Sequence, residues 1–201
     1  MPKIEAWWFS ASDILPHGDG RKVVIGEKLS VKGPLVLCHN GMHACRTPWQ
    51  ALQYAPGSLL HKVILEGGVK EESDKLCGRS RTAIERRDAT NMLRLFARKQ
   101  ALGVLHLWEA KMSVPDIVRH YLETGDPAAR SAADSAARSA ARSAAESAAE
   151  SVARNAAWSA AWSAAESVAR SAAWSAARSA AESAAGDMLN AMVAELFSKE
   201  G

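Results

Sequence analysis

The second half of the chain is dominated by a four-residue repeat, which restricts the fold more than any other feature of the sequence. Fourteen tetrads of the form A/V-A-x-S/N follow one another without a break from Ala128 to Ser183. Alanine has the highest helix propensity, and the Arg and Glu residues that often occupy the third position also favour helix. Some of these charges form opposite-sign pairs four residues apart, such as Arg142 with Glu146. The repeat therefore predicts a long helix.

A period of four does not match the 3.6 residues of a helical turn, so each tetrad position advances by about 40° per repeat. No fixed apolar face forms, which disfavours a left-handed coiled coil. The small side chains instead allow close helix approach, in a right-handed winding of several chains or in stacked segments. Among them, Trp158, Trp162 and Trp174 are the predicted partner-binding residues. The alternative is a solvated spacer helix with exposed indoles.

Before the repeat, the pattern changes to short apolar runs bounded by Gly, Pro or Asp, which are typical of strands. The expected strands cover residues 4–9, 22–25, 35–37 and 61–65. Thr47 as a cap and Pro48 in the first turn predict a short helix before the last of these strands. From Asp88, apolar residues recur at helical spacing, and Gly125 is expected to end a later helix.

The predicted fold class is α+β, with a small mixed α/β N-terminal domain followed by an all-helical, alanine-rich tetrad-repeat region. Large apolar side chains, which bury more surface than alanine, are concentrated in the first part. The expected divisions are a mixed α/β domain at 1–110, a connecting helix and cap at 111–127, the repeat helix at 128–185 and a short amphipathic helix at 186–201.

The charge balance excludes a strong electrostatic attraction to nucleic acid or membranes. The chain has 25 basic and 22 acidic residues, a net charge of +3. No run of about 20 apolar residues is present, and the first ten residues lack the apolar stretch of a signal peptide. A cytoplasmic location is therefore expected, and the three cysteines are expected to be thiols.

Reactive side chains are concentrated in the segment LCHNGMHAC, residues 37–45. Cys38, His43 and Cys45 are candidate metal ligands together with His39, and Cys77 is a distant fifth candidate. The spacing lacks the paired C-x2-C units of structural zinc sites, so small buried cysteines are the alternative, and we predict no metal or other cofactor. A nucleophilic pair of Cys45 with His43 or His39 is a further alternative.

A basic cluster follows between residues 75 and 87. Lys75, Arg79 and Arg81 are candidate ligand-binding residues, because arginine binds phosphate or carboxylate with two parallel hydrogen bonds. The alternative is a solvated surface, since acidic residues are interspersed. Standard nucleotide-binding motifs, a P-loop and G-x-G-x-x-G, are absent from the sequence.

The segments GPLVLCHNGMHAC, TPWQALQYAPG, LHKVILEGGV, DKLCGR and LRLFARKQAL with HLW follow one another between residues 33 and 108. Together they resemble a family of bacterial and phage proteins that carry a G-[FLM]-H-A-[CS] motif, an A-L-x-Y-A-P-G motif and alanine-rich tetrads, and with the tetrads the resemblance extends over nearly the whole chain. The family has no established activity. The phage context implies the hypothesis of a protein that blocks a component of host defence.

A fainter similarity is to ADP-ribosyltransferase-like folds. It implies a nucleotide-using enzyme or a degenerate binder of NAD or ADP-ribose, in which Arg79 or Arg81 contacts phosphates and His43 lies near the ribose. The aromatic segment at 7–9 lacks the His or Arg that this chemistry requires on that strand. We therefore expect a non-catalytic binding protein, whose repeat helix self-associates or docks on a protein partner, and keep the enzyme as the alternative.

Overall fold

The computed structural model describes residues 3–16, 19–110, 113–155 and 163–198, without the side chains of residues 144–180. Helices are combined with antiparallel sheets, so the protein is α+β as predicted. The chain divides into two compact units. Unit 1 comprises Met1–Arg94 and Gly186–Gly201, and unit 2 comprises Leu95–Ala185. In the sequence, unit 2 is thus an insertion into unit 1.

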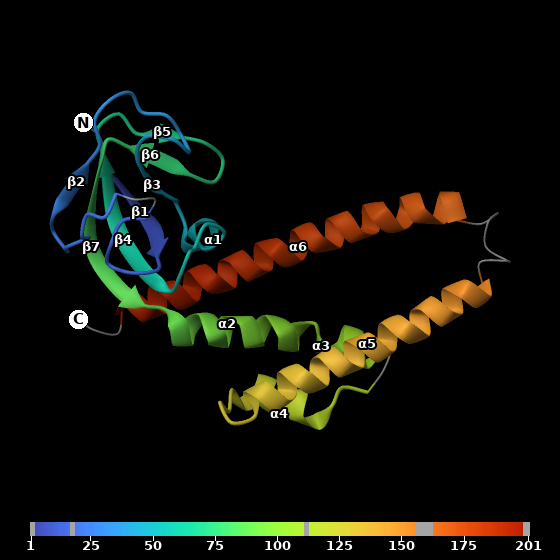
Figure 1. Ribbon diagram of the computed structural model, residues 1–201. Coiled ribbons are helices and arrows are strands. Elements are labelled where there is room, and N and C mark those ends of the chain that lie inside the picture. The colour runs from blue at the N-terminus through green and yellow to red at the C-terminus, as the bar shows by residue number, and fades with distance from the viewer. Residues whose placement is uncertain (1–2, 17–18, 111–112, 156–162, 199–201) are drawn as a thin grey trace. The chain divides into compact units, whose positions relative to one another are not determined.

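Unit 1 is built on two antiparallel sheets (Figure 1). The described strands are β1 (Ile4–Ser10), β2 (Lys28–Ser30), β3 (Met42–Ala44), β4 (Leu59–Glu66), β5 (Lys70–Glu71), β6 (Leu76–Gly78) and β7 (Ser80–Asp88). The larger sheet has the order β1-β4-β7-β2 and the smaller one the order β3-β6-β5. A bridge between Trp7 and Cys45 links β1 to the chain directly after β3.

Two of the four expected strands are confirmed as β1 and β4, and two are wrong. Lys22 forms only an isolated bridge with Ile14, and Val36 pairs with Asn40 across a tight turn. Of the apolar side chains that suggested these strands, Val24, Ile25 and Val36 are solvent-exposed, whereas Val23 and Leu35 are buried although they lie in loops. Apolar β-branched residues in surface loops give the same short pattern as a buried strand.

The larger sheet is buried on both faces because its strands carry apolar residues at odd and even positions. On one face, Ala6, Val63 and Leu65 pack with Met42 and Leu76 of the smaller sheet. Leu65 and Leu76 are fully buried. The smaller sheet therefore covers this face of the larger one.

The opposite face is covered by helical segments of unit 1. The described helices of the two units are α1 (Pro48–Leu52), α2 (Thr90–Gly103), α3 (Leu105–Glu109), α4 (Asp116–Thr124), α5 (Arg130–Asn155) and α6 (Ser163–Ser198). Phe9 and Leu60 of the sheet pack with Ala51 of α1, Ala89 before α2 and Val193 of α6. The red end of α6 lies beside this sheet in Figure 1. The core of unit 1 thus joins the beginning and the end of the sequence.

Helix α1 begins as the sequence predicts. The Thr47 hydroxyl accepts the Gln50 N–H at 3.2 Å, and the Gln50 side chain accepts the Thr47 N–H at 3.2 Å. This capping box satisfies two backbone donors at once. A third donor, the Trp49 N–H, is bound by the side-chain oxygen of Asn190 in α6 at 3.1 Å. The last part of α6 therefore completes the start of α1.

Gly186 allows α6 to approach α1 closely. A Cβ atom at this position would lie 2.9 Å from Cδ1 of Trp49, closer than side chains tolerate. Beyond it, Leu189 and Val193 are fully buried, four residues apart on one helix face. Phe197 places its ring 5.1 Å from that of Trp7 in an edge-to-face contact. The apolar residues of the predicted amphipathic segment at 186–201 thus pack in the core of unit 1.

Unit 2 has a small core of its own between α3, α4 and the start of α5. Leu105, Val114, Val118 and Ala133 are buried there. Helix α4 ends at Gly125 in the left-handed conformation, φ 72°, as the sequence predicts. Repeat residues 130–155 and 163–185 are helical, residues 128–129 form a turn before α5, and residues 156–162 of the expected repeat helix lie outside the described residues. No helix of the described ranges is both long and apolar enough to cross a membrane.

Candidate functional site

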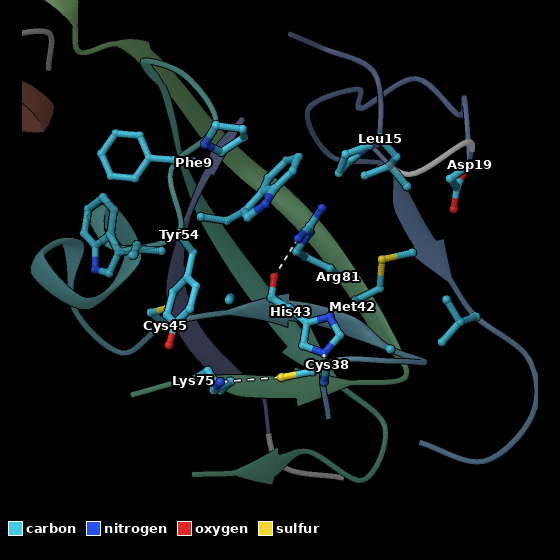
Figure 2. A pocket seen from close by; sticks show the side chains of 18 of the residues that line it. Phe9, Leu15, Asp19, Cys38, Met42, His43, Cys45, Tyr54, Lys75 and Arg81 are labelled. Carbon is cyan, nitrogen blue, oxygen red and sulfur yellow. Dashed lines mark hydrogen bonds between the residues drawn. The ribbon is translucent and has the colours of Figure 1, made fainter. Parts of the chain in front are cut away.

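A pocket of about 820 Å³ opens in unit 1, within the size range of small-molecule sites (Figure 2). Its lining combines β1, the chain from residue 38 to 45, α1, Lys75 and β7. The charged and reactive side chains in it are Asp19, Cys38, His39, His43, Cys45, Tyr54, Lys75 and Arg81. The pocket therefore brings together the two candidate segments, LCHNGMHAC and the basic cluster, which are more than thirty residues apart in the sequence.

Arg81 is the buried cation of this pocket. Arg81 is only 5% exposed, and its guanidinium carbon lies 3.6 Å from the ring centre of Trp8. Nη1 donates a hydrogen bond to the His43 carbonyl oxygen at 2.6 Å. Within the described residues this is the one hydrogen bond of a group that carries five N–H donors. The remaining donors are left for a ligand.

No described carboxylate forms an ion pair with Arg81. The nearest acidic residue of the pocket, Asp19, instead pairs with Arg21, with 2.7 Å between Oδ1 and Nε. Burial lowers the pKa of Arg81 to about 9, and the Asp19 charge offsets this only in part. At neutral pH the guanidinium is therefore charged. A buried charge without a counter-ion is costly, and an anionic ligand would supply the missing charge.

His43 connects Arg81 to Cys38. Its carbonyl accepts from Arg81, and its Nε2 accepts the backbone N–H of Cys38 at 3.0 Å. Nε2 is therefore unprotonated. Burial lowers the pKa of His43, followed by the charges of Arg81 and Lys75. The neutral imidazole thus fixes the turn that carries Cys38 in place.

The three cysteines have different environments. Cys38 is exposed, and its sulfur lies 3.5 Å from Nζ of Lys75 (Figure 2). Cys45 and Cys77 are buried. Burial raises the pKa of the Cys45 thiol to about 11 and also raises that of Cys77. As a nucleophile Cys45 is thus a weak candidate, and the geometry favours Cys38.

A second buried polar group lies behind the pocket wall. His61 of β4 is fully buried, and its ring stacks 4.7 Å from that of Trp8. Its Nε2 lies 2.8 Å from the Ser10 hydroxyl, which itself donates to the Ser12 carbonyl at 2.7 Å. The hydroxyl has one proton, so Nε2–H must donate to it and Nδ1 is left without a partner. His61 and Ser10 thus fix Trp8, the platform under Arg81.

The other predicted site residues lie elsewhere. Arg79 is absent from the pocket lining, and its guanidinium donates to the Gly33 carbonyl at 2.8 Å. Trp158 and Trp162 lie outside the described residues, and only the backbone of Trp174 is described. Among the described His, Cys, Asp and Glu side chains, no group of three is placed to hold a metal ion.

Sequence reasoning missed Trp8 and His61. Both lie in runs recognised as strands, where aromatic and histidine side chains are ordinary core residues. The signal that could have found them is the position of each residue within its strand, because alternate residues share one face of a sheet. Trp8 pairs with His61 across β1 and β4, and both side chains lie on the face that carries Arg81. No family model, curated protein or solved structure matches this chain. The site therefore has to be interpreted from its own chemistry.

Proposed function

We propose that this chain is a non-catalytic binding protein whose unit 1 takes up the anionic group of a ligand at Arg81. The observation that carries the proposal is the buried guanidinium without a counter-ion, stacked on Trp8 and open to the pocket. Charge-assisted hydrogen bonds from a guanidinium are strong and directional, and exclusion of water strengthens them further. A carboxylate or phosphate is the group that fits.

The pocket around Arg81 favours a ligand of mixed character. Lys75 contributes a second cation, while Trp8, Phe9 and Met42 provide apolar walls. Such a combination suits a small molecule or a short peptide segment with an anionic end and an apolar or aromatic body. The alanine-rich repeat would then form the all-helical arm that self-associates or docks on a protein partner through its tryptophans.

The second candidate is a nucleotide-using function related to ADP-ribosyltransferases. It is favoured by one observation, the common pocket of His43 and Arg81, which that resemblance assigns to the ribose and the phosphates. ADP-ribose and NAD are therefore included among the test ligands.

Isothermal titration calorimetry of the full-length protein tests the proposal. The ligands are inorganic phosphate, glutarate, ADP-ribose and NAD, and the variants are Arg81→Gln and, as a matched control, Arg79→Gln. Loss of hydrogen bonds to a charged group costs about 1.5–3 kcal/mol, so Arg81→Gln should weaken binding roughly 10- to 100-fold. Arg79→Gln removes the same charge outside the pocket and should leave affinity unchanged.

Two results would count against this function. Equal affinities of the two variants would show that the anion binds elsewhere. Turnover of NAD by the wild-type protein would favour the enzyme over the binding protein.

The proposed role of the repeat arm has a test of its own, native mass spectrometry. The wild-type protein should form a defined oligomer, and the triple variant with Trp158, Trp162 and Trp174 changed to Ala should not. A monomer in both cases would contradict self-association.

A further inference from the structure

Cys38 is an exposed thiol beside a cation. Its sulfur lies 3.5 Å from Nζ of Lys75, a position from which a positive charge faces any negative charge that develops on the sulfur during a reaction. In turn, the hydrogen bond with Cys38 is the largest cause that raises the pKa of Lys75. The two side chains therefore act as a pair. The other thiols, Cys45 and Cys77, are only 5% and 0% exposed.

Lys75 is held in position by neighbouring side chains. Its Nζ lies 5.2 Å from the ring centre of Tyr54, a cation–π contact. The Tyr54 hydroxyl in turn donates to the carboxylate of Asp74. These contacts restrict a side chain that would otherwise move freely in solvent. The ammonium consequently stays beside Cys38.

The backbone at Cys38 is also fixed in an unusual conformation. Cys38 has φ 63°, a left-handed value that non-glycine residues rarely adopt. Its N–H is bound by His43, whose carbonyl accepts from Arg81. One residue thus positions both the thiol turn and the buried cation. Both Cys38 and Arg81 line the same pocket (Figure 2).

We propose that Cys38 exchanges with small disulfides that carry carboxylates, Arg81 holding a carboxylate of the ligand while Cys38 forms a mixed disulfide with it. The proposal rests on the anion binding at Arg81 proposed above and adds the class of ligand and a covalent step.

The step is a thiol–disulfide exchange. The Cys38 thiolate attacks one sulfur of the ligand, the ligand's S–S bond breaks as the new Sγ–S bond forms, and the second sulfur leaves as a thiolate that takes a proton from water. The Cys38 sulfur is oxidised and the leaving sulfur is reduced, so no other oxidant is required.

The experiment follows the reaction of the reduced full-length protein by intact-mass spectrometry. The two probes are glutathione disulfide, which carries carboxylates, and 2-hydroxyethyl disulfide, which is uncharged. Rates are divided by those of N-acetylcysteine, so that the intrinsic reactivities of the probes cancel. We expect one adduct per chain, abolished in Cys38→Ser, and a normalised preference for glutathione disulfide of roughly tenfold or more, the effect of one good charged hydrogen bond.

Variants separate the roles of the two cations. Lys75→Met should slow both probes about tenfold or more, since it removes the charge beside the sulfur, whereas the exposed Lys32→Met should change neither. Arg81→Gln should slow only the reaction with glutathione disulfide. Because Arg81 is buried, circular dichroism is used to check that Arg81→Gln is folded. The preference of the wild-type protein for glutathione disulfide over 2-hydroxyethyl disulfide tests the proposal without any variant.

Several outcomes would overturn the proposal. These are an adduct on Cys45 or Cys77 in place of Cys38, equal normalised rates with the two probes, and an unchanged rate in Lys75→Met. Calorimetry of Cys38→Ser with glutathione disulfide separates this proposal from the proposed function. Binding by this variant without adduct formation by the wild-type protein refutes the exchange alone, whereas absence of both refutes anion binding as well.

Discussion

The buried imidazole of His61 should make the stability of the protein depend on pH. Burial is the largest cause that lowers the pKa of His61, followed by the charges of Arg81 and Arg86, and the folded value is about 4. The unfolded chain binds a proton at the ordinary value of 6.5. Between these values the unfolded state binds more protons. The stabilisation is therefore complete above pH 6.5 and decreases as the pH falls towards 4.

The size of the effect follows from the two pKa values of His61. Their difference is about 2.5, and one pKa unit corresponds to about 1.36 kcal/mol, so the free energy of unfolding should fall by roughly 3 kcal/mol over the whole range. Between pH 7 and pH 5 the expected loss is about 2 kcal/mol. Carboxylates with lowered pKa, such as those of Glu66 and Asp88, lose their stabilisation mainly below pH 5, whereas His43, whose pKa is also lowered, adds to the loss within the window.

Urea denaturation of the full chain at pH 7 and pH 5, followed by tryptophan fluorescence, measures this loss. In His61→Gln the amide can still donate to the Ser10 hydroxyl but does not titrate, so the loss should be about 2 kcal/mol smaller than in the wild-type protein. His106→Gln is the matched control, because it replaces an exposed histidine on α3 by the same residue and leaves the buried imidazole of His61 in place. Equal losses in the wild-type protein and His61→Gln would refute the reasoning.

Two further predictions concern packing and backbone conformation. Leu189→Ala should lower the free energy of unfolding by about 2–5 kcal/mol, the usual cost for a fully buried leucine. Met188→Ala is the control, because Met188 is 37% exposed and its loss should cost much less. Equal costs of the two variants in urea denaturation would contradict the packing of the last turns of α6 in the core of unit 1. Gly125→Ala should destabilise the end of α4 by about 1 kcal/mol or more, because φ is 72°, a left-handed value that alanine adopts only with strain, and the guanidinium of Arg98 would have to shift to make room for the new Cβ. Gly103→Ala is the control, because a Cβ at this position would meet no atom within 4 Å, and it should be neutral or stabilising. Thermal melts of the two glycine variants measure these effects.

The elements that sequence analysis predicted correctly are those whose signal is local. A helix cap depends on adjacent residues, and Thr47 followed by Pro48 identifies the start of α1. Similarly, glycine at position 125 ends α4 because only glycine adopts a left-handed conformation without strain. The short apolar, partly β-branched run that predicted β4 is a local signal as well.

The missed elements depend on contacts between distant residues. The run SRTAIERRD was not among the predicted strands, because its arginines suggested ligand-binding residues or a solvated surface. It forms β7, in which Arg81 and Ala83 are buried. A buried arginine has no distinctive pattern in one sequence, and its burial depends on stacking with Trp8, some seventy residues earlier. The candidate site was therefore predicted in its parts, His43, Lys75 and Arg81, but not in its arrangement.

The position of residues 186–198 in the core of unit 1 also has a consequence for synthesis of the chain. Asn190 binds a backbone group 141 residues earlier, and Val193 fills the same cluster as Phe9 and Leu60. While the ribosome is still translating the repeat, the first ninety residues have an uncovered apolar face. A message that ends within the repeat would yield a product that exposes this face, which quality-control proteases and chaperones recognise. The apolar face of unit 1 is thus covered only after residues 186–198 have been synthesised.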